Sequence, residues 1–260
     1  MDWIRIEDRG PLRWLTLERP DRKNAVPSPD GWGELAREFE AFERSDLRVL
    51  VITGAGGDFC SGADLDPSRL AEVPSTITRK RAMNRVADAA LALHRISKPT
   101  IAAVDGVAAG AGMNLALGCD VVVATDRARF SEIFVRRGLS VDFGGTWLLP
   151  RIVGLQRAKE LALSGRMVGA DEAVRIGLCL ESVAPEKLVG RVTDIAGSFL
   201  GGAPVAQMFT KQTLDRSFEM SIEDALDWEG QSQAICFATE DATEGVTAFI
   251  EKRSPEFRGR

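Results

Sequence analysis

The sequence predicts an α/β protein, with a layered core built on parallel strands and a helical region at its C-terminal end. Three short apolar segments, Val49–Thr53, Thr100–Val104 and Val121–Ala124, have the length and composition of buried strands. Helical stretches accompany them, and after Gly144 the chain reads mostly as helices. Buried strands followed by helices are typical of a parallel sheet that is covered by helices.

The N-terminal elements follow from hydrophobic periodicity. Trp3–Asp8 and Leu12–Leu17 alternate apolar and polar residues around a Gly-Pro turn, which predicts a β-hairpin. Gly33–Arg44 has apolar residues at helical spacing before the first buried strand. Met83–Ile96 is a second helical stretch, and it stops before the Pro that precedes the second strand.

The second half of the chain is predicted to be mainly helical. The expected helices are Thr146–Val153, Leu155–Ser164, Ala170–Ile176, Pro185–Leu200, Pro204–Phe218, Ile222–Phe237 and Thr243–Arg253. We therefore divide the chain into an α/β core over residues 1–200 and a C-terminal helical region over residues 201–260.

Composition excludes several classes of protein. The 260 residues are 45% hydrophobic and 27% charged, with a net charge of -5, which argues against disorder and against a nucleic-acid or anionic-membrane partner. Four scattered cysteines and a single histidine, His94, predict neither a zinc site nor a disulfide framework. With no signal peptide visible, we expect a cytoplasmic protein without a tightly bound cofactor.

Two loops rich in small residues follow predicted strands. They are Phe59–Leu65 and Ala109–Leu115, and the second opens a helix. Small residues let a ligand approach backbone N–H groups closely, so two such loops could together form an oxyanion hole. Tight turns alone are the alternative explanation of these glycines. The order of the glycines in the second loop does not match a dinucleotide-binding motif, so NAD is rejected.

Asp142 lies among apolar residues just before a predicted helix. One interpretation is that its side chain caps the helix, because Asp is a preferred residue there. The other is that Asp142 is a catalytic acid/base, since a dry environment would raise its pKa.

Taken together, these segments resemble the crotonase (enoyl-CoA hydratase/isomerase) superfamily. The residues that carry the resemblance are Phe59–Asp64, Ile101–Asp120 and Gly144–Thr146. Within the superfamily, Asp142–Arg151 and Lys252–Pro255 are most similar to isomerases that act on a phenylacetyl-derived ring epoxide.

The resemblance implies a spiral of ββα units and a C-terminal trimerisation region, with homotrimers that often pair into hexamers. It also implies acyl-coenzyme A as substrate, with CoA entering as part of that substrate. By motif position, the amides of Ala63 and Ala111 would form the oxyanion hole, and Asp142 would be the catalytic carboxylate.

Further residues are matched to the binding of the substrate and its CoA. They are Arg22, Lys23, Ala25, Ser61, Asp64, Leu65, Asn114, Phe134, Phe249 and Lys252. Of these, Phe249 and Lys252 match positions that reach the CoA of a neighbouring subunit, although Lys252 could equally be a solvated helix residue.

The chain departs from the hydratases of the superfamily at both of their catalytic glutamates. Asn114 and Phe134 occupy these positions, and neither side chain can serve as an acid/base near neutral pH. Glu132 lies two residues from the second position, and we interpret it as structural or solvated.

These departures favour an enoyl-CoA isomerase that moves a double bond from position 3 to position 2, or isomerises a ring epoxide. A hydratase that uses Asp142 and water is the second hypothesis. A nucleophilic Asp142, as in the aryl-CoA dehalogenases of this superfamily, has little support because His94 is a poor candidate for the base. The hypothesis from another class is a non-catalytic acyl-CoA-binding or RNA-binding relative, although the acidic net charge argues against RNA.

Overall fold

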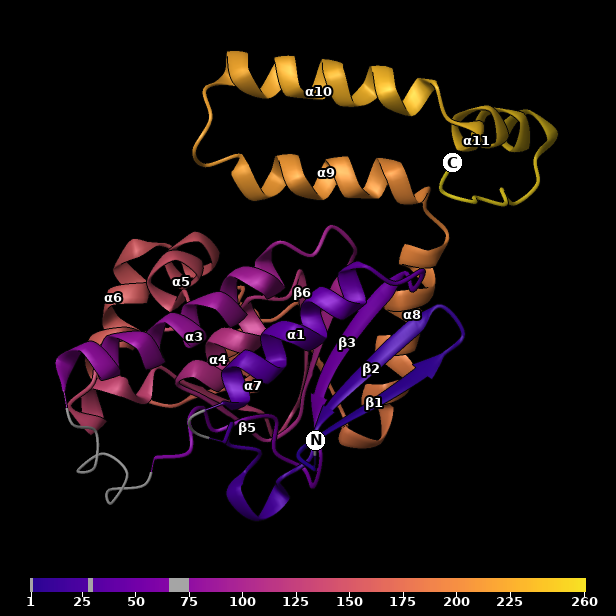
Figure 1. Cartoon of the computed structure of the whole chain (residues 1–260). Helices are drawn as coiled ribbons and strands as arrows, with labels where there is room; N and C mark the ends of the chain where they lie inside the picture. Colours follow the sequence, from indigo (N-terminus) through magenta and orange to yellow (C-terminus); the bar gives the residue numbers. More distant parts are fainter. Residues whose placement is uncertain (1, 28–29, 66–74) are drawn as a thin grey trace. The chain divides into compact units, whose positions relative to one another are not determined.

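A parallel sheet organises the N-terminal part of the chain. We describe a computed structural model of residues 2–27, 30–65 and 75–260 (Figure 1). In this part of the chain a six-stranded sheet has the order β1-β2-β3-β4-β6-β9. Its strands are β1 Ile4–Arg9, β2 Leu12–Leu17, β3 Val49–Gly54, β4 Thr100–Val104, β6 Val121–Thr125 and β9 Glu181–Val183.

The predicted hairpin and the three predicted buried strands are confirmed. The hairpin pairs β1 with β2 antiparallel, and β2, β3, β4, β6 and β9 then follow in parallel register. Every residue of β4 is buried, as expected for a strand in the middle of a covered sheet. The carboxyl ends of the parallel strands therefore lead into loops at one edge of the sheet, where a ligand site is expected.

A second, smaller sheet was not predicted. It has the order β5-β7-β8, with β5 Val107–Ala109, β7 Arg129–Ser131 and β8 Val168–Gly169. Strands this short fall below the window in which hydrophobic periodicity can be recognised. The sheet matters for the site because β5 leads directly into the second glycine-rich loop, while β7 precedes Glu132.

Helices connect the strands and cover the sheet. In the N-terminal part these are α1 Gly31–Glu43, α3 Thr76–His94, α4 Ala111–Leu117, α5 Gly145–Val153, α6 Leu155–Ser164 and α7 Ala170–Arg175, with short 3-10 turns η1 Pro20–Arg22, η2 Ile133–Arg137 and η3 Pro185–Lys187. Helix α3 begins earlier than predicted, because the Ser75 side chain accepts a hydrogen bond from the Thr78 amide and caps a polar, exposed first turn.

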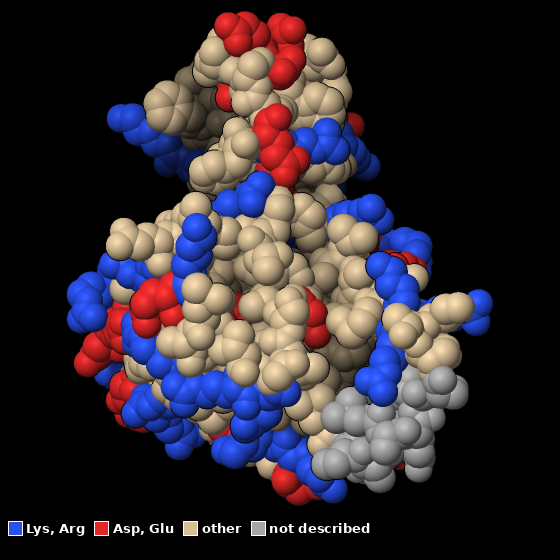
Figure 2. All heavy atoms as spheres, turned by 90° about the vertical axis from the view of Figure 1, so that its left-hand side faces the viewer, with Lys and Arg blue, Asp and Glu red and all other residues tan. Residues whose placement is uncertain are grey.

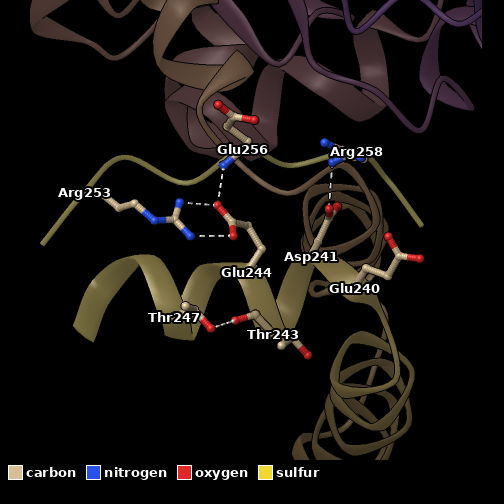
Figure 3. Close-up of a pocket in the computed structure, with 8 residues that line it drawn as sticks. All are labelled: Glu240, Asp241, Thr243, Glu244, Thr247, Arg253, Glu256 and Arg258. Carbon is tan, nitrogen blue, oxygen red and sulfur yellow. Dashed lines mark hydrogen bonds and ion pairs between the residues drawn. The ribbon is translucent and has the colours of Figure 1, made fainter. Parts of the chain in front are cut away.

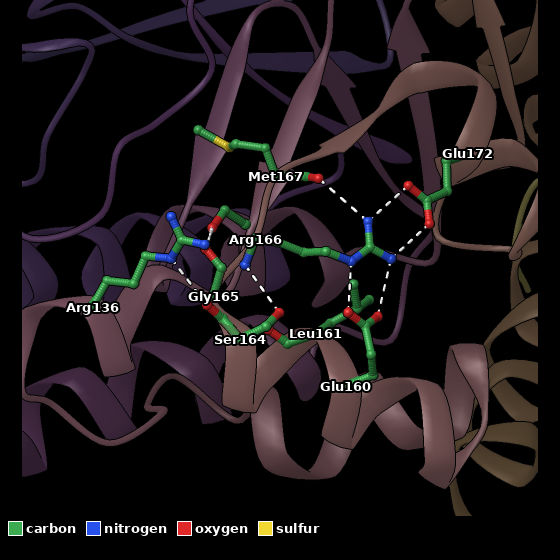
Figure 4. Close-up of polar contacts among 9 residues, drawn as sticks. Arg136, Glu160, Leu161, Ser164, Gly165, Arg166, Met167 and Glu172 are labelled. Atoms are coloured by element: carbon green, nitrogen blue, oxygen red, sulfur yellow. Dashed lines mark hydrogen bonds and ion pairs between the residues drawn. The ribbon is translucent and has the colours of Figure 1, made fainter.

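Arg166 ties two of these helices together (Figure 4). Its guanidinium contacts Glu160 on α6 at 2.7 Å and Glu172 on α7 at 2.7 Å. These ion pairs keep the pKa of both carboxyl groups below the ordinary value. The network connects α6 and α7 around β8, next to the segment that carries Glu132.

The contacts divide the chain into two units. One comprises residues 1–96 and 100–192, and the other comprises residues 97–99 and 193–260. The division falls within helix α8 Leu188–Leu200, and the second unit continues with α9 Pro204–Arg216, α10 Ile222–Phe237 and α11 Glu240–Glu251. The predicted helical C-terminal region is thus present.

The end of the chain folds back along α11 (Figure 3). Buried Asp241 accepts hydrogen bonds from the amides of Arg258 and Gly259, at 2.6 and 2.8 Å. The Arg253 guanidinium binds both carboxylate oxygens of Glu244, at 2.6 and 2.8 Å. These bonds engage Asp241, Glu244 and Arg253, three of the charged residues that line a pocket between α11 and the tail.

Charged side chains of both signs share the face shown in Figure 2, where Lys and Arg lie interspersed with Asp and Glu around an uncharged area. Across the described ranges 2–27, 30–65 and 75–260, no helix is both long enough and apolar enough to cross a membrane. The same residues contain no cluster of His, Cys, Asp and Glu arranged to hold a metal ion.

Candidate active site

The two glycine-rich loops pack directly against each other. Cys60 bridges to Ala108 in parallel register, and the Ala109 amide donates to the Cys60 carbonyl at 2.9 Å. A Cβ on Gly112 would lie 2.2 Å from the Cys60 carbonyl oxygen, so that position has no room for a side chain. The glycine is therefore required for this close approach of the loops, and more than a tight turn is involved.

This packing brings the predicted amide donors into one place. A Cβ on Gly62, the residue before Ala63, would lie 3.3 Å from the Ala111 amide nitrogen. The Val26 amide donates to the Gly62 carbonyl at 2.8 Å, and the Asp64 amide donates to the Val26 carbonyl at 3.0 Å. The amide of Ala63, which lies between them, therefore points away from Val26. The Ala111 amide begins α4, where a helix has no acceptor of its own for the first N–H groups.

The loop that carries Asp142 is held by its neighbour. Phe143 is buried with a left-handed backbone conformation (φ 49°), and its ring lies 5.0 Å from that of Trp32. Helix α5 is capped by Gly144, and the Asp142 side chain makes no capping bond. The interpretation of Asp142 as a helix cap is therefore wrong, because the left-handed turn at residues 143 and 144 places it outside the helix.

Asp142 is half-buried, and one of its carboxyl oxygens faces the interior. Its Oδ1 is buried and has no hydrogen-bond partner. Burial raises the pKa of Asp142 to about 6, because desolvation disfavours the charged form. A carboxyl group with a pKa close to neutral can both take and return a proton.

Asn114 lies beside Asp142 in the interior. Its side chain is fully buried, and its Nδ2 donates to the Asp142 carbonyl at 2.9 Å and to Glu132 Oε2 at 3.4 Å. A Cβ on Gly145 would lie within 2.6 Å of the Asn114 amide group, so Gly145 makes room for this contact. Asn114 thus joins α4 to the Asp142 loop without titrating.

The second hydratase position is filled by an apolar ring. Phe134 is buried, and the edge of its ring lies 3.6 Å from the place a Cβ on Gly110 would occupy. Gly110 directly precedes Ala111, so the ring borders the loop of the predicted oxyanion hole. Neither of the two positions that the sequence analysis matches to the hydratase glutamates carries an acid in this chain.

Of the two interpretations of Glu132, structural or solvated, burial excludes the second. Its side chain is 1% exposed, and its Oε1 has no hydrogen-bond partner. Burial raises the pKa of Glu132 to about 8, the hydrogen bond from Asn114 lowers it, and the charge of Asp142 raises it further. A second carboxyl group therefore lies near Asp142, on the residue that follows β7. We call the group formed by Glu132, Asn114 and Asp142 the acid pocket.

A group of the matched CoA-binding residues lies together around η1. The Ser61 hydroxyl donates to the Arg22 carbonyl at 3.2 Å, and the Lys23 ammonium contacts Asp58 at 2.9 Å. Arg22 and Lys23 are exposed, while Ala25 is buried. The segment around Arg22 and the loop that leads to Ala63 are thus connected, with two cations at the surface.

Two residues that the sequence analysis missed hold this group together. Arg19 donates to the Ala25 carbonyl and to Asp64 Oδ2, each at 2.8 Å. Buried Asn24 donates to the carbonyls of Ala55 and Asp58, at 2.8 and 2.6 Å. A positively charged residue before a Pro-Asp turn gives no sequence signal for such a role. We call Arg19, Asn24, Ala25, Asp58 and Asp64 the Arg19 cluster.

The other matched positions are more exposed or belong to the second unit. Leu65 follows Asp64 and is 46% exposed. Phe249 is 84% exposed near the end of α11, and Lys252 caps that helix with a left-handed conformation. His94 has no catalytic partner in the described residues; its ring lies against Trp147 at 5.2 Å, as expected for a structural residue.

Comparisons with known proteins identify the family of this chain. The family model described as enoyl-CoA hydratase/isomerase matches residues 9–260. The chain is 37% identical to a short-chain-enoyl-CoA hydratase of Clostridium acetobutylicum, over 98% of this chain and 97% of that protein. It is 36% identical to the 1,2-epoxyphenylacetyl-CoA isomerase of Escherichia coli, over the full length of both.

Solved structures show the same fold. A probable enoyl-CoA hydratase/isomerase from Mycobacterium abscessus is 35% identical, with a TM-score of 0.91 over 99% of both chains. An enoyl-CoA hydratase/isomerase from Cupriavidus metallidurans is 36% identical, with a TM-score of 0.91 over 100% of this chain and 97% of that one. The predicted spiral fold is confirmed. The relatives named as a hydratase and as an isomerase have similar sequence identities to this chain, 37% and 36%.

Proposed function

The chain belongs to the enoyl-CoA hydratase/isomerase family, and within that family we propose that it is an isomerase of enoyl-CoA thioesters. The observation that carries the proposal is the Asp142 carboxyl group, which is desolvated, has an unpartnered oxygen and a pKa raised to about 6. Asn114 and Phe134 stand where two acids would be needed to activate and deliver water.

The proposed reaction moves one proton. The Asp142 carboxylate removes a proton from C2 of a 3-enoyl thioester, and the electron pair of that C–H bond delocalises into a dienolate. The protonated Asp142 then returns the proton to C4, so that the double bond lies between C2 and C3. No atom is gained or lost, and one carboxyl group serves as base and then as acid.

The negative charge of the dienolate would be stabilised by backbone amides. The close approach of Gly62 to the Ala111 amide supports a pair of donors from Ala63 and Ala111. Alanine in place of the usual glycine at position 111 is acceptable because the backbone N–H is the group required. Removing one donor of an oxyanion hole typically costs about 10²–10³ in rate.

Coenzyme A would bind along the Arg19 cluster. Arg22 and Lys23 are the exposed cations next to Ser61, and they suit the phosphates of CoA. Ala25, Asp64 and Leu65 would line the same cleft. In a homotrimer or a dimer of trimers, Phe249 and Lys252 of a neighbouring chain would complete the site. We further propose a cytoplasmic enzyme that needs no cofactor beyond the CoA of its substrate.

Asp142→Asn tests the isomerase directly. The amide keeps the shape of the side chain but cannot accept the proton, so kcat for 3-enoyl-CoA should fall by about 10²–10⁴ with CoA binding intact. Stopped-flow absorbance for the conjugated product and calorimetric titration with CoA measure the two quantities. Unchanged turnover in the variant would refute the role of Asp142. The same assay with a phenylacetyl-derived ring epoxide distinguishes the two substrate classes.

Hydration is the second candidate, and buried Glu132 favours it as a second carboxyl group near Asp142. Crotonyl-CoA incubated with the enzyme separates the two: fast loss of the conjugated double bond supports a hydratase. A binding protein without activity would instead show CoA affinity and no turnover across a panel of enoyl-CoA, ring-epoxide and haloaryl-CoA thioesters.

A further inference from the structure

Three oxygen atoms in the acid pocket lack a hydrogen-bond donor. They are Glu132 Oε1, Asn114 Oδ1 and Asp142 Oδ1, and all three are buried. Buried acceptors that stay unsatisfied cost free energy, so a group of three in one place calls for a physical explanation.

The side-chain amide of Asn114, the donor nearest to these oxygens in sequence and contact, is already used. The two hydrogens of Asn114 Nδ2 are directed to the Asp142 carbonyl at 2.9 Å and to Glu132 Oε2 at 3.4 Å. If Glu132 and Asp142 were both ionised, two buried negative charges would share this one amide. A proton on Glu132 removes one charge and converts an unpartnered acceptor into a donor.

We propose that Glu132 is a positioning residue for the isomerisation: its carboxyl group stays neutral during turnover and holds Asn114, and through it the Asp142 loop, in the productive arrangement. This inference rests on the proposed role of Asp142 as the acid/base. Glu132 itself would exchange no proton with the substrate. Its task is to leave Asp142 as the one carboxyl group that ionises near neutral pH.

The surroundings of Glu132 support a neutral group. Helix α4 faces it with Asn114, which does not titrate, and the loop before α5 faces it with Asp142. The charged residues of neighbouring α6 are exposed, and the Arg136 guanidinium on η2 is turned to the Ser164 carbonyl at 2.9 Å. No cation among these groups compensates a charge on Glu132, which agrees with its pKa of about 8.

The inference predicts a second limb in the pH dependence of kcat. Below about pH 6, Asp142 is protonated and cannot act as the base. Above about pH 8, Glu132 ionises, its donor is lost, and a second negative charge opposes the dienolate. Activity should therefore rise through the lower pKa and fall through the higher one.

Glu132→Gln is the decisive variant, because the amide is permanently neutral and still offers N–H donors. We expect kcat at pH 7 to fall a few-fold, the acid limb to stay near pH 6, and the alkaline limb to disappear. Glu186→Gln, which changes an exposed acid on η3, is the control and should keep both limbs. An alkaline limb that persists in Glu132→Gln overturns the proposal.

Thermal unfolding gives a readout that does not depend on catalysis. Because the folded-state pKa of Glu132 is raised to about 8, the unfolded chain releases this proton at lower pH, and stability falls as pH rises between the two values. Glu132→Gln should therefore melt at a higher temperature than the wild type at pH 9, with a much smaller difference at pH 4. Equal differences at both pH values would overturn the proposal.

The assays also separate this inference from the proposed function. Full activity in Asp142→Asn refutes the acid/base role itself, whatever Glu132 does. An inactive Asp142→Asn together with an unaltered alkaline limb in Glu132→Gln refutes the role of Glu132 alone. If wild-type enzyme hydrates crotonyl-CoA rapidly and Glu132→Gln loses that activity by about 10² or more, Glu132 is a base for water and the neutral-acid proposal is wrong.

Discussion

The acid pocket and the Arg19 cluster use polar residues in opposite ways. In the acid pocket, Glu132, Asn114 and Asp142 each keep a buried oxygen without a partner. In the Arg19 cluster, the Arg19 guanidinium contacts both Asp64 and the Ala25 carbonyl. The difference shows where the fold leaves capacity for chemistry: the unsatisfied carboxyl groups of Glu132 and Asp142 can take a proton, whereas the paired groups of the Arg19 cluster hold a shape.

The largest expected effect comes from removing the buried Phe143 ring, which follows Asp142 in the chain and packs against Trp32. Phe143→Ala should lower the free energy of unfolding by about 3–5 kcal/mol, as for other buried Phe→Ala changes. It should also admit water to Asp142, so the pKa of Asp142 falls and the acid limb of kcat moves below about pH 6. Chemical denaturation measures the free energy of unfolding, and the pH profile of kcat locates the acid limb.

Phe143→Leu is the matched control, since it keeps an apolar side chain in the same cavity. It should lose less stability than the Ala variant and shift the acid limb less. An acid limb that stays in place in Phe143→Ala would mean that burial by this ring does not set the proton affinity of Asp142.

A smaller effect is expected from separating the two loops. A side chain on Gly112 collides with the Cys60 carbonyl, so Gly112→Ala must displace the segment that carries the Ala111 amide. If that amide stabilises the dienolate, kcat should fall by about 10²–10³. Gly190→Ala is the control, because a Cβ there meets open space. Equal turnover in both variants would contradict the oxyanion-hole assignment.

The smallest effect should come from the Arg19 cluster. Arg19→Ala frees Asp64 and the Ala25 carbonyl, so we expect KM for the acyl-CoA to rise about tenfold, which corresponds to about 1.4 kcal/mol. The two limbs of the pH profile should stay in place, because Asp142 and Glu132 are untouched. A fall in kcat at constant KM would mean that the Arg19 cluster acts on the chemical step, as the acid pocket does, and would contradict the contrast between the two regions.

Much of the fold could be predicted because hydrophobic periodicity is a local property. The hairpin, the three buried strands and helices such as Leu155–Ser164 and Ile222–Phe237 were located to within a residue or two of their bounds. The strands β5, β7, β8 and β9 were missed, since two or three residues carry no period. The early start of α3 was missed because its first turns are exposed and polar.

The sequence by itself determined which side chains can carry chemistry: Asp142 is present, and the positions matched to the two hydratase acids hold Asn114 and Phe134. Tertiary structure alone decided what surrounds them. It placed Glu132, the residue after β7, in the acid pocket. It also brought Arg19 into contact with Asp64, which lies 45 residues away in the chain. The physical reason is that proton affinity depends on desolvation and on neighbouring charges, and both are set by residues distant in sequence.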